Sequence, residues 1–221
     1  MVQFSAMAAL AINTASSTEA LAIFDEKKVI AEISWRGQSD ESEKLLPSLL
    51  HVLKKAKCKM NDISRIIIVS GPGPFSALRI GVTVANVLAY QYNIPLYAID
   101  TPTLWRERIS RTASASYTIL LLHAGGKYVH RSGAGLKEKI GTMEEVLNFK
   151  SLKKKMIFFG DLTEAETADL KRLRRAALTP ESALCTFGQT MLQMPQKLFE
   201  KMPMVAPQYW RPPNITKMSN F

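Results

Sequence analysis

The sequence predicts an α/β fold in two lobes, on the strength of three observations. First, three strand-like segments follow one another near the N-terminus, at residues 7–13, 19–25 and 28–34, separated by short polar turns. Second, helix-like and strand-like segments alternate after them, which is typical of α/β proteins. Third, the chain has 221 residues and its second half repeats this pattern in reduced form, so we expect two small lobes rather than one large domain.

The first half predicts two long helices around a buried strand. A polar stretch at residues 37–43 supplies helix-start chemistry, and the helix expected at about 41–55 carries leucines at i, i+4 and i+8 spacing. The β-branched segment 65–70 predicts a strand that is buried on both faces. A glycine and proline turn follows it, then a helix at about 75–92 and a strand at 95–99.

The second half predicts a smaller lobe. Residues 105–116 are polar and lack β-branched periodicity, so we expect the junction between the lobes there. Beyond it the sequence predicts a hairpin, a helix, a strand and two helices, at residues 117–123 with 127–131, 142–150, 156–159, 163–176 and 182–200. The prolines of the last stretch predict an extended tail. The expected domains are an N-terminal lobe at 1–105, a smaller C-terminal lobe at 106–202 and a tail at 203–221.

The composition is that of a globular protein with a core of its own. Apolar residues make up 47% and charged residues 22%, which excludes a disordered, collagen-like or coiled-coil chain. Only Cys58 and Cys185 are present, so neither a disulfide framework nor a zinc ribbon is expected. The apolar start lacks an early positive charge and no apolar run approaches about 20 residues, so we expect a cytoplasmic protein without a signal peptide or membrane span.

Two turns carry the residue types of an anion site, although a structural turn is the favoured interpretation of each. Gly71 and Gly73 lie between a strand and a helix, where backbone N–H groups can hold a phosphate. No Lys-Ser/Thr pair of a Walker A loop follows, and the dinucleotide fingerprint lacks its third glycine. Asn13 and Thr14 end the first strand without an acidic residue to hold Mg²⁺. These four residues are candidate remnants of a nucleotide site.

The histidines predict neither a metal centre nor a catalytic group. His51, His123 and His130 include no i, i+4 pair that would place two imidazoles on one helical face. No serine or cysteine partnership of the kind that nucleophilic catalysis needs accompanies them. We therefore expect no catalytic residue and no metal ligand in this chain.

The leucine stripe and the helix at 75–92 offer more apolar surface than one sheet face requires. Core packing is the usual role of such residues, and a helical docking surface is the alternative. The net charge of +10 and the basic clusters around Lys54, Lys154 and Arg174 allow weak contact with RNA backbone, although a solvated surface is the default.

Four stretches match the sequence patterns of one known family. They are residues 10–20 (Leu-Ala-Ile-Asn-Thr-Ala-Ser-Ser-Thr-Glu-Ala), 45–47 (Leu-Leu-Pro), 71–81 (Gly-Pro-Gly-Pro-Phe-Ser-Ala-Leu-Arg-Ile-Gly) and 205–213 (Val-Ala-Pro-Gln-Tyr-Trp-Arg-Pro-Pro). In these stretches the chain resembles the bacterial TsaB, or YeaZ, family of threonylcarbamoyladenosine biosynthesis proteins. The third stretch is the most specific, because it is close to the family signature Gly-Pro-Gly-Ser-Phe-Thr-Gly-Leu-Arg-Ile-Gly.

The resemblance implies an actin-like or Hsp70-like fold with two ribonuclease-H-type lobes (βββαβα), the second of them degenerate. It implies a noncatalytic subunit that docks the catalytic subunit TsaD and acts with the ATPase TsaE, in threonylcarbamoyl transfer to adenosine 37 of tRNA. The helices at about 41–55 and 75–92 would bind TsaD, or a second copy of the chain in isolation. The implied contact residues are Leu45, Leu46, Leu49, Leu50, Leu53, Phe75, Leu78, Arg79 and Val82.

The chain departs from the family pattern at several positions. Asn13 stands where the family usually has Asp, and residues 123–126 (His-Ala-Gly-Gly) stand where it has Asp-Ala-Arg. Both carboxylates that could hold Mg²⁺ are missing, so we expect weak or absent binding of ATP and Mg²⁺ and no cofactor. Pro74 and Ala77 replace the usual Ser and Gly and stiffen the turn, which leaves docking open.

An enzyme remains the alternative from a different class. An actin-like ATPase or small-molecule kinase would have the same fold, because fold does not fix function. That alternative needs a carboxylate at the end of the first strand, which this sequence lacks. A peptidase is disfavoured because no nucleophile, base and metal set can be assembled from the sequence.

Overall fold

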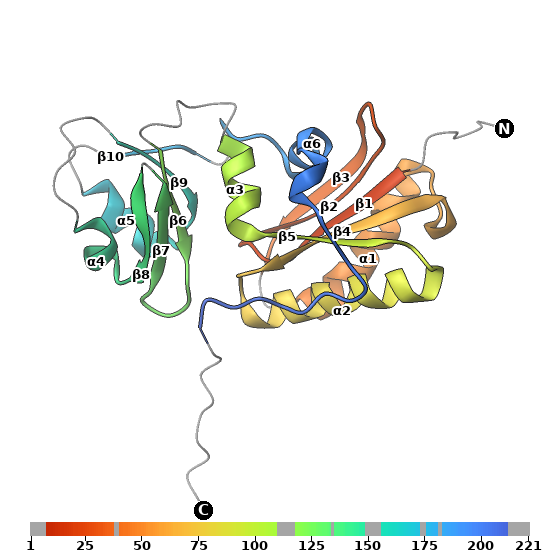
Figure 1. Cartoon of the computed structure of the whole chain (residues 1–221), viewed down its shortest axis with the longest axis horizontal. Helices are drawn as coiled ribbons and strands as arrows, with labels where there is room; N and C mark the ends of the chain where they lie inside the picture. The colour runs from red at the N-terminus through yellow and green to blue at the C-terminus, as the bar shows by residue number, and fades with distance from the viewer. Residues whose placement is uncertain are drawn as a thin grey trace, which may run out of the picture.

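Two β-sheets, each at the centre of its own lobe, form the framework of the protein (Figure 1). The computed structural model describes residues 8–37, 40–109, 118–133, 135–148, 156–172, 176–180 and 183–211. The mixed α/β architecture and its two lobes confirm the fold class that the sequence predicts. None of the described helices is long and apolar enough to cross a membrane.

The first sheet has six strands in the order β11-β5-β4-β1-β2-β3. They are β1 (Ala8–Asn13), β2 (Thr18–Phe24), β3 (Val29–Arg36), β4 (Ile63–Gly71), β5 (Leu96–Asp100) and β11 (Glu200–Met202). The first three form the predicted antiparallel meander, and β4 and β5 extend the sheet in parallel. Every residue of β1 is buried, because helices cover both faces of the sheet.

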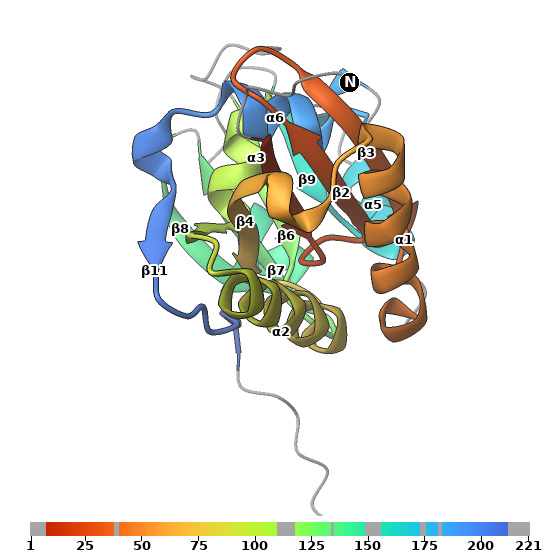
Figure 2. The same cartoon turned by 90° about the vertical axis from the view of Figure 1, so that its right-hand side faces the viewer.

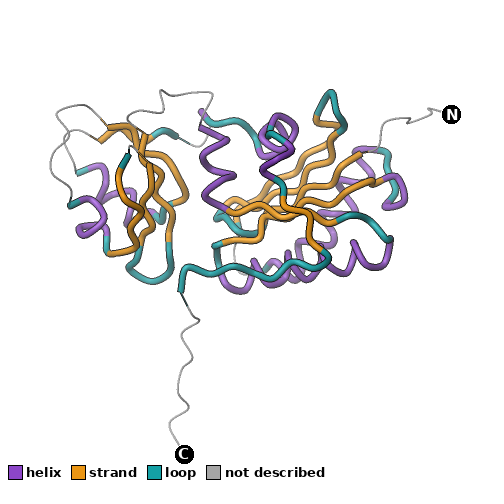
Figure 3. Tube along the Cα trace, in the orientation of Figure 1, coloured by secondary structure: helices purple, strands orange, loops and turns teal. Residues whose placement is uncertain are grey.

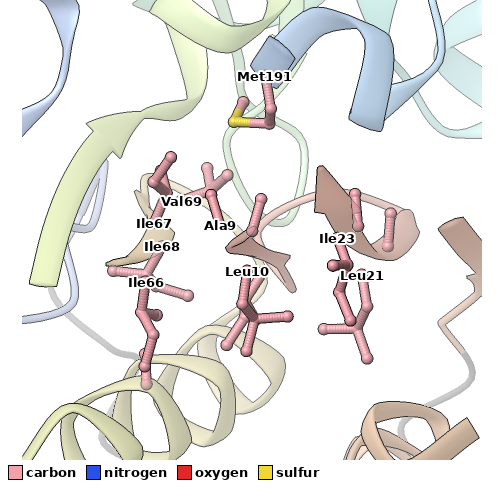
Figure 4. Packing of buried hydrophobic residues seen from close by; sticks show 14 of the residues in the cluster. Ala9, Leu10, Leu21, Ile23, Ile66, Ile67, Ile68, Val69 and Met191 are labelled. Atoms are coloured by element: carbon pink, nitrogen blue, oxygen red, sulfur yellow. The ribbon is translucent and has the colours of Figure 1, made fainter. Parts of the chain in front are cut away.

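Helices α1 (Glu41–Ala56) and α2 (Phe75–Tyr92) cover one face of the first sheet, and α3 (Thr101–Ile109) and α6 (Phe187–Gln193) lie on the other (Figure 1). Figure 2 shows α1 and α2 next to each other on the outside of this lobe. Ile66 and Ile68 point toward the long helices, whereas Ile67 and Val69 point toward Met191 of α6 (Figure 4). Successive side chains of β4 thus point to opposite faces of the sheet and contribute to the core on each face.

The second sheet has five strands in the order β10-β9-β6-β7-β8, which repeats the strand order of the first sheet without β11. The strands are β6 (Thr118–His123), β7 (Val129–Gly133), β8 (Leu136–Gly141), β9 (Met156–Asp161) and β10 (Ala176–Leu178). Short helices α4 (Met143–Leu147) and α5 (Glu164–Lys171) pack on one face. The other face contacts Trp105 and Ile109 of α3, so α3 lies between the two sheets (Figure 1).

The predicted junction at 105–116 is wrong in its first part, because residues 105–109 continue α3. The Asp100 carboxylate accepts hydrogen bonds from the Thr103 backbone N–H at 2.7 Å and from its hydroxyl at 3.0 Å, and so holds the start of this helix. The composition of the segment gave no sign of these bonds. Residues 110–117 lie outside the described part of the chain.

The predicted lobe 106–202 is wrong at its C-terminal end, because the chain returns to the first lobe. Helix α6 packs on β2 and β3, and β11 pairs antiparallel with β5. The second lobe is therefore an insertion within the first. Short elements replace the predicted helices at 163–176 and 182–200, since α5 stops at Lys171 and a 3₁₀ turn (Gln196–Leu198) precedes β11. A second 3₁₀ turn, Met60–Asp62, precedes β4. The sequence analysis did not predict the strands β8, β10 and β11.

From Pro203 to Arg211 the chain forms no helix or strand and lies against the body. Figure 3 shows it as a loop that runs beside α2 toward the second lobe. The Val205 backbone N–H donates to Asn86 Oδ1, and Asn86 Nδ2 donates to the Val205 carbonyl, both at 2.9 Å. Residues 212–221 of the expected tail lie outside the described part of the chain.

Candidate functional site: a helical face and an interlobe cavity

Large apolar side chains are exposed mainly on the outside of α1 and α2 and on the chain beside α2. This surface, the apolar face, consists of Leu46, Leu50, Phe75, Val87, Tyr90, Tyr92 and Met204. In the described part of the chain the only other exposed large hydrophobic residue is Ile140, on β8. Leu50 is 69% exposed and Tyr90 is 90% exposed, so the lobe leaves these side chains in water. Exposed apolar residues gathered in this way are typical of interaction surfaces, so the apolar face is the first candidate site.

Five of the nine predicted contact residues do not belong to this surface. They are Leu45, Leu49, Leu53, Leu78 and Val82, each at most 7% exposed and packed in the core of the first lobe. The i, i+4, i+8 stripe that begins at Leu45 faces the sheet, so these residues are unavailable to a partner. The offset pair Leu46 and Leu50 lies on the outer side of α1.

Phe75 and Arg79, the remaining predicted contact residues, lie at the start of α2 and are both exposed. The Arg79 guanidinium carbon is 5.0 Å from the centre of the Phe75 ring, which is a cation–π contact. Phe75 also packs against Tyr209, with ring centroids 4.7 Å apart. The start of α2 is thus shared between the apolar face and the C-terminal segment.

The sequence analysis did not single out Val87, Tyr90, Tyr92 or Met204 as contact residues. Val87 and Tyr90 are one turn apart on the outer side of α2, in a helix that has apolar residues all around its circumference. A helix of this kind must be covered on more than its sheet-facing side. That excess of apolar residues was the available signal, but it does not say which of them face outward.

One end of the apolar face is basic. Lys54, Lys55, Lys57 and Lys59 are exposed at the C-terminal end of α1 and in the turn after it. A shallow hollow there is lined by Leu50, Lys54 and Tyr92, among other residues. At the opposite end of the helix Lys44 pairs with Asp40 at 2.6 Å. A partner that lies on this end meets apolar side chains together with a cluster of lysines.

A second candidate site is a cavity of about 520 Å³ between the lobes, a size usual for small-molecule sites. It is lined by the β1–β2 turn, the start of α2, the β6–β7 turn, the end of β9 and residues 209–211. Among its polar lining residues are Ser17, Arg36, His123, Asp161 and Arg211. In the described ranges no group of three or more His, Cys, Asp and Glu side chains is placed to hold a metal ion.

The four predicted nucleotide-site residues are engaged in packing and in local hydrogen bonds. Asn13 is 4% exposed, and its Oδ1 accepts a hydrogen bond from the Ala15 backbone N–H at 3.0 Å. Thr14 is fully buried against Gly81 of α2. Gly71 lies against the Gln208 carbonyl and Gly73 against the Ala15 backbone, at distances that leave no room for a Cβ atom. Of the four, Gly73 alone lines the cavity.

An acidic side chain from the second lobe binds the β1–β2 turn, where the sequence analysis placed a candidate remnant of a nucleotide site. The Asp161 carboxylate, at the end of β9, accepts the Ser17 backbone N–H at 2.7 Å and the Ser17 hydroxyl. The two residues are 144 positions apart, so no local sequence pattern announces the contact. A backbone N–H that could hold a bound anion is thus paired with an anion of the protein itself.

One lining residue of the cavity, His123, forms a histidine–carboxylate pair with a buried glutamate behind it. His123 Nδ1, at the end of β6, is 2.8 Å from Glu166 Oε1 of α5. The hydrogen bond to Glu166 raises the pKa of His123 against the opposing effect of burial. Burial would raise the pKa of Glu166, but hydrogen bonds from His123 and from the Thr163 N–H outweigh it and lower that pKa. The sequence analysis named His123 but found no partner for it.

The chain is similar to named proteins along much of its length. A family profile described as TsaD, tRNA N6-adenosine threonylcarbamoyltransferase, matches residues 36–168. The tRNA threonylcarbamoyladenosine biosynthesis protein TsaB of Buchnera aphidicola subsp. Schizaphis graminum is 28% identical over 165 residues, which are 69% of this chain and 77% of the relative. TsaB of Bacillus subtilis is 34% identical over 95 residues, which are 43% of this chain and 42% of that protein.

A solved structure has the same fold. YeaZ from Pseudomonas aeruginosa superposes with a TM-score of 0.66 at 18% sequence identity, and the match covers 91% of this chain and 99% of that one. The profile match spans more than half of the chain, and the curated relatives carry the name TsaB. The chain therefore belongs to the family described as TsaD, tRNA N6-adenosine threonylcarbamoyltransferase, and within it to the TsaB, or YeaZ, proteins of tRNA threonylcarbamoyladenosine biosynthesis.

Proposed function

We propose that this chain is a noncatalytic subunit of the cytoplasmic machinery that makes threonylcarbamoyladenosine in tRNA, and that it docks a TsaD-like catalytic subunit through the apolar face. A TsaE-like ATPase completes the machinery, and the same face pairs two copies of the chain when the catalytic subunit is absent. The observation that carries this proposal is the placement of exposed apolar residues, nearly all of which lie on or beside α1 and α2.

Burial of this face accounts for the driving force of docking. Leu50 and Tyr90 are largely exposed, and each loses most of its contact with water when a helical partner covers it. Removal of apolar surface from water contributes roughly 25 cal/mol per Å² before the costs of association are subtracted. Aromatic residues such as Tyr90 are also enriched among the residues that dominate binding energy.

The charge at the end of α1 specifies the chemistry of the partner. Lys54 and Lys55 flank the apolar face in the last turn of the helix, where positive charge is also favoured by the helix dipole. A partner surface with acidic residues opposite these lysines gains complementary charge, which speeds association and fixes register.

The proposal includes a cleft that does not use Mg-ATP. The Asp161 carboxylate accepts hydrogen bonds from the Ser17 N–H and hydroxyl, and the Asn13 side chain accepts one from the Ala15 N–H in its own turn. A nucleotide phosphate would have to displace an internal carboxylate of the same sign. Isothermal titration with Mg-ATP tests this directly, and micromolar binding with turnover would favour an actin-like ATPase or small-molecule kinase instead.

The docking test substitutes an outward leucine of α1. Leu50→Asp replaces an apolar contact by a charge at the proposed interface, and a pair with Lys54 one turn further along offsets the cost of burying that charge only in part. We expect an affinity for the TsaD-like subunit about 100-fold lower or weaker still, as measured by titration of the purified subunits. Ile140→Asp is the matched control, because it puts the same charge on an exposed apolar position of the second lobe.

Equal binding by the Leu50→Asp variant and the native chain, with the variant folded, would exclude this face as the interface. The role in tRNA modification has a separate readout. Depletion of the protein should lower threonylcarbamoyladenosine in digested tRNA, and the native chain should restore it while Leu50→Asp does not. A normal nucleoside level after depletion would remove the functional assignment.

A further inference from the structure

The C-terminal segment 203–211 connects the two lobes without belonging to either sheet. Its first part is fixed to the first lobe, where Val205 pairs with Asn86 of α2 and the Gln208 N–H donates to the Ser70 carbonyl at 2.8 Å. Tyr209 then packs on Phe75, with ring centroids 4.7 Å apart. We call this segment the strap.

The last two residues of the strap contact the second lobe. The Trp210 ring is stacked on His130 of β7 with centroids 4.1 Å apart and ring planes 20° apart. The Arg211 guanidinium carbon is 4.1 Å from the centre of the Tyr128 ring. His130 is only 2% exposed, so Trp210 closes over a buried side chain rather than resting on an outer surface. Within two residues the strap therefore passes from one lobe to the other.

A second connection crosses the cavity by a different route. Asp161, at the end of β9 in the second lobe, binds the Ser17 backbone and hydroxyl in the β1–β2 turn of the first lobe. Hydrogen bonds to an ionised carboxylate are stronger than those between neutral groups. Ser17, Asp161 and Trp210 all line the same cavity, so the two connections enclose it.

The lobes are also joined at α3, and this contact serves as the reference for the other two. Trp105 and Ile109 of α3 pack against the second sheet, and Arg106 pairs with Glu138 of β8 at 2.9 Å. Helix α3 follows directly from β5 of the first lobe, so it joins the first sheet to the second. The strap and the Asp161–Ser17 contact are two further connections between the lobes, away from α3.

We propose that the strap and the Asp161–Ser17 contact together form an internal lock that holds the lobes in this arrangement without a bound ligand. In a two-lobed protein with an open cleft, a ligand that contacts both lobes normally stabilises closure. Here the carboxylate and the two strap side chains provide contacts of that kind from within the chain. With the lock in place, the lobes keep their arrangement through contacts within the chain and need no ligand.

The first experiment removes the strap contact and measures a distant amide. Trp210→Ala deletes the ring on His130 and leaves in place the Asp161 carboxylate that binds Ser17. We expect hydrogen exchange of the Ser17 N–H to become roughly tenfold faster, because each opening of the lobes exposes it. Small-angle scattering should show a larger radius of gyration. Arg211→Ala, which removes a contact of an exposed side chain, tests the same prediction in a milder variant.

The second experiment breaks the other half of the lock. Asp161→Ala removes both acceptors of Ser17, and Asp169→Ala is the control because that carboxylate is exposed on α5 and pairs with Arg172 one turn away. Fluorine NMR of the 5-fluorotryptophan-labelled chain reports on Trp210. We expect its resonance to move toward the position of an exposed indole in Asp161→Ala and to stay unchanged in Asp169→Ala.

Protection of the Ile67 amide, in the centre of β4, shows in each variant that the first lobe is folded. Faster Ser17 exchange in Trp210→Ala and a shifted Trp210 resonance in Asp161→Ala would establish that the two contacts act on one opening. If each substitution changes only its own neighbours and the scattering is unaltered, the inference is overturned, and α3 alone holds the lobes.

Discussion

The two lobes share one strand order but differ in the helices that cover it. In the first lobe α1 and α2 have 16 and 18 residues, whereas α4 and α5 in the second lobe have 5 and 8. The long helices present a second, outward side with Leu50 and Tyr90 exposed on it. The short helices cover one side of their sheet and offer little more. The sheet topology is common to both lobes, so the comparison teaches that helix length is what gives the first lobe its apolar face.

The two lobes also begin their corresponding helices in different ways. Helix α5 starts with a capping box, in which Thr163 accepts the Glu166 N–H and Glu166 accepts the Thr163 N–H. Helix α2 starts after Pro74 without a side-chain cap and without an acidic residue in its first turn. The start of α2 is instead covered by Tyr209 of the strap. Local hydrogen bonds thus stabilise the start of α5, whereas a residue far away in the sequence, Tyr209, packs on the start of α2.

The largest expected effect separates the cores of the two lobes. Leu10→Ala in β1 and Leu121→Ala in β6 each remove a fully buried side chain, so each should lower the free energy of unfolding by about 2–5 kcal/mol. The second-lobe core around Leu121 is small, so its loss should raise hydrogen exchange in the second lobe alone. Leu10→Ala should raise exchange throughout the first lobe. Uniform loss of protection in both variants would show that the lobes unfold as one unit.

The next effect concerns the His123–Glu166 pair, which has no counterpart at the end of β1, where Asn13 stands. The raised pKa of His123 stabilises the fold below the unfolded value of 6.5, and this is lost as the pH rises through the folded pKa. The lowered pKa of Glu166 stabilises the fold above 4.5, and this is lost as the pH falls through the folded pKa. The pair therefore stabilises the fold most between these two values.

Glu166→Gln tests this dependence, because the amide keeps an acceptor for the Thr163 N–H and removes the charge. The His123 side chain is 34% exposed, so solvent limits the loss to about 0.5–1 kcal/mol near pH 5.5, and the loss should shrink above pH 7. Urea unfolding at both pH values measures it. Glu164→Gln on the same helix is the control, and a loss that grows with pH would contradict the assigned pair.

The last comparison concerns the helix starts. Thr163→Ala removes the side-chain cap of α5 and should lower the free energy of unfolding by about 1 kcal/mol. Ser76→Ala, an exposed hydroxyl in the uncapped first turn of α2, should change it by less than about 0.5 kcal/mol. Thermal or urea unfolding of the two variants checks the order. Equal losses would mean that the Ser76 hydroxyl holds the start of α2 after all.

Much of the first lobe could be predicted because its signals are local. The β-branched run of β4, the glycine and proline turn and the periodic apolar residues of α2 each lie within a short window. The second lobe was less accessible to prediction, since β8, with Lys137, Glu138 and Lys139, has the composition of a surface loop. Helix α3 was missed because its start depends on the Asp100 side chain, whereas the segment after it is polar.

The site was predictable only to the level of the element. The leucines of α1 indicated exposed apolar surface on that helix, but the pattern alone could not separate Leu49, which faces the sheet, from Leu50, which faces water. The decision depends on where the sheet lies, and that is fixed by strands far away in the chain. The Asp161–Ser17 contact joins positions 144 residues apart, and no periodicity within one segment reports such a pair.

The insertion of the second lobe into the first has a consequence for how a ribosome delivers this protein. Strands β6 to β10 leave the ribosome as one continuous stretch, so the second lobe has all its strands while synthesis continues. The first sheet still lacks its edge strand β11 and the cover that Met191 of α6 gives to Val69. The nascent first lobe therefore keeps part of one sheet face without its apolar cover until α6 and β11 have been made, and this interval is when a chaperone has most to protect.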